Sequence, residues 1–83
     1  MFEVVEPAKA MDVREILSAR ELEVLEMASH GLTNLQIASL LSVTVHAVKF
    51  HLAAIYRKLG VRNRTEAAVL FLTARPARAS GPE

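Results

Sequence analysis

The chain has 83 residues, carries a formal net charge of +1 and contains no cysteine, which is enough for one small domain and excludes a pair of domains. A hydrophobic content of 52% excludes an intrinsically disordered chain, and the longest uninterrupted apolar run, Ala67–Leu72, is too short to cross a bilayer. The first residues lack the basic segment and apolar core of a signal peptide, and the absence of cysteine suits the cytosol.

The near-neutral total conceals two halves of opposite charge. Residues 1–32 carry seven acidic and three basic side chains, whereas residues 33–83 carry seven basic and two acidic ones. No acidic residue lies between Thr33 and Thr65. This asymmetry suggests an anionic partner for the second half, although charge alone leaves open two ordinary solvated faces.

Residues 1–16 are expected to form an N-terminal arm or linker, with an extended piece at 2–6 and a helical turn at 12–16. A capping box at Ser18–Glu21 predicts the start of the first full helix, and Gly31 predicts its end. The stripe expected to face the core is Leu22, Leu25 and Ala28. The face expected to be exposed to solvent carries Arg20, Glu23, Glu26 and His30.

A second capping box at residues 33–36 opens a short helix that reaches residue 41. Residues 42–43 are only long enough for a tight turn, after which Thr44 caps a third helix that ends at Gly60. The apolar stripe of this third helix is Val48, Leu52, Ile55 and Leu59. Its opposite face carries His46, Lys49, Phe50, Ala53 and Arg57.

Asn63 can cap a fourth helix from Arg64 to about residue 74, and residues 75–83 are expected to be a disordered tail. The sequence therefore predicts an all-α, four-helix bundle-like domain at residues 17–74. The turn between its second and third helices is short enough for a helix-turn-helix.

Over residues 17–72 the chain resembles the LuxR-type (FixJ- or NarL-type) helix-turn-helix domain of bacterial transcription regulators. The matching stretches are Leu17–Leu25, Gly31–Asn34, Ile37–Ala38, Val48–His51 and Ile55–Ala67. The resemblance implies a four-helix DNA-binding domain of the bacterial cytoplasm, with its third helix in the major groove. It also implies a homodimer formed through the fourth helix.

The residues of the third helix favour DNA binding independently of the family resemblance. A helix fits the major groove, where base edges are distinguishable, and its outer face needs cations for phosphates and no negative charge. Lys49 and Arg57 are expected to contact phosphates or bases, and His46 and Phe50 to contact base edges or sugars. For Phe50 the alternative is a half-buried side chain folded against the second helix, and Lys49 could be an ordinary solvated lysine.

Thr33, Asn34 and Thr44 are expected at helix starts, where backbone N–H groups bind phosphate. With the four residues already named, the predicted DNA-binding set is Thr33, Asn34, Thr44, Val45, His46, Lys49, Phe50, Ala53 and Arg57. Three positions depart from the family's usual residues: Leu35 and Ala53 replace common polar or basic side chains, and Ala47 replaces threonine. These departures predict weaker binding or a flatter salt dependence.

The fourth helix is apolar on nearly every side, so two opposite faces of it must be covered by other parts of the protein or by a partner. Ala67, Leu70 and Phe71 can face the core, which leaves the predicted dimer interface as Thr65, Ala68, Val69 and Leu72. A symmetric dimer would cover that interface and set the spacing of two DNA half-sites. The alternative is that it packs under Phe2 or Val4 of the N-terminal arm.

No enzymatic, cofactor or metal site is expected. His46 and His51 are five residues apart, about 140° around a helix, and do not form a metal pair. The chain has no phosphate-binding glycine loop and no nucleophile motif. Glu23 and Glu26 share a helix face that could contact RNA polymerase. The rival to a DNA reader is a protein-interaction module on the same scaffold, with little DNA affinity.

Overall fold

The computed structural model describes residues 12–73, and all of its regular structure is helical. The helices are α2 (Val13–Ile16), α3 (Ala19–Ser29), α4 (Asn34–Leu41), α5 (Val45–Leu59) and α6 (Arg64–Thr73). This confirms the predicted all-α fold class. The extended piece expected at 2–6 and the tail expected at 75–83 lie outside the described residues.

Each described helix begins at a side-chain cap that the sequence predicts or allows. Ser18 Oγ accepts a hydrogen bond from the N–H of Glu21, whose carboxylate in turn accepts from the N–H of Ser18. Thr33 and Gln36 form the same reciprocal box at α4, over 3.1 and 2.8 Å. These bonds satisfy N–H groups that have no partner inside the helix, which fixes where each helix starts.

Three residues at or just after helix ends lie in the left-handed backbone region. Gly60 ends α5 with a φ of 71°, and Gly31 follows α3 with a φ of 91°. Ser42 ends α4 with a φ of 58°, a conformation that carries a steric cost for a residue with a Cβ. The tight turn predicted at 42–43 is therefore present, but it is made by a serine where glycine is less strained.

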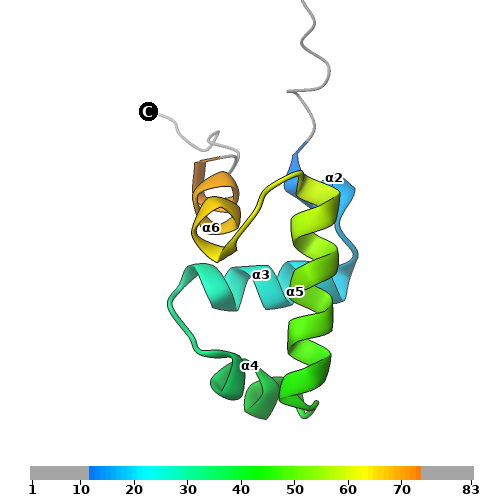
Figure 1. The fold of residues 1–83 in the computed structure, drawn as a ribbon, viewed down its shortest axis with the longest axis vertical. Coiled ribbons are helices and arrows are strands. Elements are labelled where there is room, and N and C mark those ends of the chain that lie inside the picture. Colours follow the sequence, from blue (N-terminus) through cyan, green and yellow to red (C-terminus); the bar gives the residue numbers. More distant parts are fainter. Residues whose placement is uncertain (1–11, 74–83) are drawn as a thin grey trace, which may run out of the picture.

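The helices meet in one core around α3, which lies between α6 and α4 while α5 runs past it (Figure 1). The buried apolar residues that pack together in this core are Val13, Leu17, Val24, Leu25, Ala28, Ile37, Ala38, Val48, Leu52, Ile55, Ala67 and Phe71. Of the stripe predicted for α3, Leu22 is only half-buried, and the buried face instead follows Glu21, Val24, Leu25 and Ala28. Val13 belongs to this core although it precedes residue 17.

The arrangement of α4 and α5 positions the candidate site. The two helices are bent by 107° at the short break between them, within the range of helix-turn-helix pairs. Within residues 12–73 no single helix is long and apolar enough to cross a membrane, and only this bent pair, taken together, has the length and composition.

Candidate nucleic-acid interface

The outer face of α5 is the largest group of predicted site residues that the structure brings together. Five side chains within about 100° of arc on this helix are all exposed: His46, Lys49, Phe50, Ala53 and Arg57. The Phe50 residue is 69% exposed, so it is not half-buried against α4. Its ring makes an edge contact with His51, with centroids 6.3 Å apart.

The inner face of α5 holds this outer face in place. Val48 and Ile55 are fully buried and Leu52 nearly so, whereas Leu59 is half-buried at the end of the stripe. Thr44 Oγ1 accepts from the N–H of Ala47 over 3.0 Å and caps the helix. The direction of the outer face is thus set by the core and by the cap.

The predicted residues at helix starts are already used by the fold. Thr33 and Thr44 each accept from their own helix, which leaves a hydroxyl hydrogen to donate elsewhere. Asn34 is half-buried, and its Oδ1 accepts from Nη1 of Arg64 over 2.9 Å. Val45 is half-buried and packs against the core.

Among the described residues, cations on the outer face of α5 have no acidic partner. Among residues 12–73 the ion pairs join Arg14 to Asp12, Arg20 to Glu23, Lys58 to Glu21 and Arg62 to Glu66. Lys49 and Arg57 belong to none of them. Both are therefore available to an anion that approaches α5.

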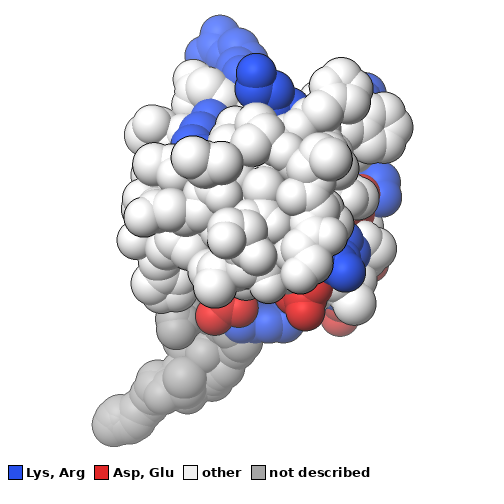
Figure 2. All heavy atoms as spheres, turned by 90° about the horizontal axis from the view of Figure 1, so that it is seen from below, with Lys and Arg blue, Asp and Glu red and all other residues white. Residues whose placement is uncertain are grey.

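The end of the domain formed by α4 and the first turns of α5 is nearly free of charge. α4 contains no charged residue, and the view of this end is mostly of uncharged side chains (Figure 2). Leu35, one of the three departures, is 70% exposed here, and Leu40 is 64% exposed. Ala53 is exposed and Ala47 half-buried. The surface around α5 therefore carries few cations, and the weaker binding that the departures predict stays a prediction.

The predicted dimer residues lie on one side of α6. Thr65, Val69 and Leu72 are exposed and Ala68 is half-buried, and helical geometry puts all four within about 100° of arc. Thr65 and Val69 line a shallow, mostly apolar groove that Val61 also borders.

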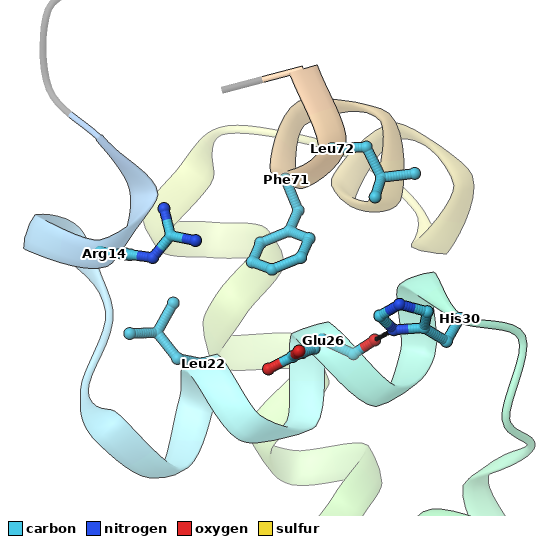
Figure 3. A pocket seen from close by; sticks show the side chains of 6 residues that line it. All are labelled: Arg14, Leu22, Glu26, His30, Phe71 and Leu72. Carbon is cyan, nitrogen blue, oxygen red and sulfur yellow. Dashed lines mark hydrogen bonds between the residues drawn. The ribbon is translucent and has the colours of Figure 1, made fainter. Parts of the chain in front are cut away.

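Leu72 borders a second hollow on the other edge of this strip, a cleft of about 270 Å³ between α2, α3 and α6 (Figure 3). It is lined by Arg14, Leu22, Glu26, His30, Phe71 and Leu72. The Arg14 guanidinium carbon lies 5.9 Å from the centroid of the Phe71 ring, and His30 Nδ1 lies 2.8 Å from the Glu26 carbonyl oxygen. Within residues 12–73 no group of acidic, cysteine or histidine side chains is placed to hold a metal ion.

A partly buried ion pair fastens the far end of α5 to α3 and was not predicted. Lys58 Nζ donates to both carboxylate oxygens of Glu21, over 2.9 and 3.0 Å. Burial acts to raise the pKa of Glu21, but hydrogen bonds from Ser18 and the charge of Lys58 oppose it, and the pKa is lowered. The capping box indicated a role for Glu21, but its partner 37 residues away left no local signal.

Arg64 is the second residue that sequence reasoning missed. It is half-buried and donates to Asn34 Oδ1 and to the carbonyl of Leu32. Burial raises the pKa of Tyr56, and the charge of Arg64 acts in the opposite direction. Arg64 therefore lies where α6, α5 and the loop before α4 meet.

These features define a helix-turn-helix domain whose second helix, α5, has an exposed outer face without acidic residues. Residues 15–71 match the family described as bacterial regulatory proteins, luxR family, which is well over half of the chain. The chain therefore belongs to the luxR family of bacterial regulatory proteins. This membership confirms the class of function expected from the residues, DNA binding in transcription regulation, and the family is one of regulatory proteins.

Several curated proteins are similar to this chain. The nitrate/nitrite response regulator protein NarP of Escherichia coli K12 is 46% identical over 66 residues, which are 80% of this chain and 31% of NarP. The probable transcriptional regulatory protein SgaR of Hyphomicrobium methylovorum is 45% identical over 62 residues, 75% of this chain and 29% of SgaR. The transcriptional regulatory protein LnrK of Bacillus subtilis is 42% identical over 67 residues, 81% of this chain and 29% of LnrK. The chain thus spans less than a third of these relatives.

Proposed function

We propose that this domain is a sequence-specific reader of double-stranded DNA that places α5 in the major groove. The observation that carries the proposal is the exposed outer face of α5, which has no acidic residue and has two cations without an acidic partner in the described part of the chain. Lys49 and Arg57 contact phosphates or bases, while His46 contacts base edges. Phe50 meets an apolar feature of the groove, such as a thymine methyl group or a sugar edge.

The starts of α4 and α5 bind the phosphate backbone on either side of the groove. Thr33 and Thr44 donate their hydroxyl hydrogens to phosphate oxygens, and Asn34 donates from its amide. Val45 and Ala53 are small or apolar enough to let α5 approach the DNA closely. These contacts fix the register of the helix, and the groove contacts select the sequence.

The domain acts as a symmetric homodimer through α6. Thr65, Ala68, Val69 and Leu72 form one strip, and pairing two copies of it removes exposed apolar surface from water. A dimer of this kind reads two half-sites separated by about one turn of DNA. We place this activity in the bacterial cytoplasm, where the DNA lies. The exposed face of α3 with Glu23 and Glu26 contacts RNA polymerase.

Selection of bound duplexes from a random DNA pool tests this function. We expect a recurring sequence with two-fold symmetry, and a binding constant that falls steeply with salt. Lys49→Ala should weaken binding without unfolding the domain. Arg62→Ala is the matched control, because its side chain is 87% exposed and lies outside the α5 face. Equal effects of the two variants on affinity would contradict the placement of α5.

A protein-interaction module is the second candidate, and one observation favours it. The exposed Leu35 and Leu40 on an uncharged helix offer apolar surface that another protein could cover. A salt titration separates the two functions. A steep loss of DNA affinity with rising salt supports the DNA reader, whereas no complex even at low salt supports the interaction module.

A further inference from the structure

Arg64, the first residue of α6, reaches back to the loop before α4. Its Nη1 donates to Oδ1 of Asn34 over 2.9 Å, and its Nη2 donates to the carbonyl of Leu32. Within residues 12–73 it forms no ion pair with a carboxylate. Its charge therefore stays uncompensated in the described part of the chain, although the side chain is half-buried.

The guanidinium determines which way the Asn34 amide is oriented. Arginine can only donate hydrogen bonds, so the atom of Asn34 that faces it must be the oxygen. The Asn34 Nδ2 group then lies on the other side of the amide. It has no hydrogen-bond partner among residues 12–73, so both of its hydrogens are left for an outside acceptor.

We propose that Arg64 is a positioning residue for DNA binding, which sets the Asn34 amide so that its Nδ2 group donates to a backbone phosphate. This inference rests on the proposed DNA-binding function and goes beyond it, because Arg64 lies outside the helix-turn-helix. The charge of Arg64 adds to the positive field at the start of α4. Arg64 thus provides a positive charge near this site, where Leu35 stands in place of the lysine or arginine that is common in the family.

The same bonds join the helix proposed for dimer contact to the helix proposed for phosphate contact. Arg64 begins α6, whereas Leu32 and Asn34 flank Thr33, the cap of α4. A planar guanidinium fork that spans two acceptors holds their relative positions better than a flexible lysine does. The placement of α4 on the DNA backbone is thereby tied to the placement of α6.

The test compares Arg64→Met with Arg62→Met. The second variant removes the same charge two residues earlier in the chain, from an exposed side chain whose ion pair within residues 12–73 is with Glu66. Binding to a duplex of about 20 base pairs, recovered from the random pool, is measured by fluorescence anisotropy at several salt concentrations. Circular dichroism gives the folded fraction in the same buffers. We expect Arg64→Met to lower affinity about tenfold and to reduce the salt slope by about one, and Arg62→Met to leave the slope unchanged.

A double-mutant cycle with Asn34→Ala shows whether Arg64 acts through Asn34. The effect of Arg64→Met on affinity should shrink in the Asn34→Ala background, because the amide it positions is gone. A role confined to stability would instead lower the melting temperature and leave the salt slope of the folded protein unchanged. An unchanged salt slope would overturn the proposal. So would additive effects of Arg64→Met and Asn34→Ala on affinity, or an Arg64→Lys variant that binds DNA as tightly as the parent chain.

An NMR measurement on the unaltered chain tests the role of the Asn34 amide without depending on whether a variant folds. The side-chain amide signals of Asn34 should shift when the selected duplex is added. Unshifted signals in a formed complex would overturn the role of Arg64 while leaving the proposed function intact. A chain that binds no duplex at low salt would overturn both, so the two failures are distinguishable.

Discussion

The two ends of α5 use the same kind of side chain in opposite ways. Lys49 is exposed and pairs with no carboxylate among residues 12–73, whereas Lys58 donates to both oxygens of the buried Glu21. The first lysine is available to an anionic partner, and the second fastens α5 to α3. The capacity of a helix to bind DNA therefore depends on which of its cations already have a partner, and not on their number.

The largest expected effect concerns the paired end. Lys58→Met should lower the free energy of unfolding by about 2 kcal/mol, because it leaves the Glu21 carboxylate buried with only its cap. The value is below that of a fully buried pair because the Lys58 side chain is 44% exposed and solvent screens the interaction. Urea unfolding measures it. Adding Glu21→Gln, which keeps the capping box, should restore part of the loss, and no recovery would contradict the pair.

The unpaired end should show the reverse pattern. Lys49→Met is expected to change the free energy of unfolding by less than about 0.5 kcal/mol, because the exposed side chain has no ion-pair partner among residues 12–73 to lose. The same substitution should weaken DNA binding by about 1 kcal/mol, roughly fivefold, through one lost contact. Urea unfolding and fluorescence anisotropy are measured on this variant and on Lys58→Met. Equal losses of stability in the two variants would contradict the difference between the two lysines.

The turns at the two ends of α5 also differ, and this gives a smaller prediction. Gly60 adopts a left-handed φ of 71° without a Cβ, whereas Ser42 adopts a φ of 58° with one. Ser42→Gly should raise the free energy of unfolding by about 0.5–1 kcal/mol in urea unfolding experiments. Ser39→Gly, the same change inside α4, should lower it by a similar amount. Equal signs for the two variants would contradict the strain at Ser42.

The smallest effect is the pH dependence that Glu21 adds. Its pKa is lowered in the folded protein, so its contribution to stability is complete above the unfolded glutamate pKa of about 4.3. That contribution is lost as the pH falls through the folded pKa. Urea midpoints measured from neutral to acidic pH should therefore fall less steeply for Glu21→Gln than for the parent chain. If the urea midpoints of the two proteins fell in parallel with pH, the Glu21 carboxylate would not be the source of this pH dependence.

Local features of the fold could be predicted from the sequence because their partners are three residues apart. The capping boxes at Ser18 and Thr33 are examples. The exposed face of α5 follows from helical spacing alone. On α3 the predicted stripe used spacings of three, whereas the true buried face drifts to Val24 and Glu21, as a period of 3.6 requires.

Contacts between distant residues could not be predicted. Glu21 and Lys58 are 37 residues apart, and Arg64 and Asn34 are 30 residues apart. Each of these residues has a simpler local interpretation as a cap or a solvated cation. Only the packing of α6 and α5 against α3 and its following loop brings the partners together, and no periodicity encodes that.

The burial of Phe71 has a consequence for synthesis. Phe71 and Ala67 of the last described helix fill the core against α3, the first full helix, so the core lacks one wall until α6 is present. On the ribosome, α3, α4 and α5 can form their local caps early, but the finished packing has to wait until residue 71 has left the exit tunnel. A chain truncated before that residue is therefore expected to remain an open set of helices and a target for proteolysis.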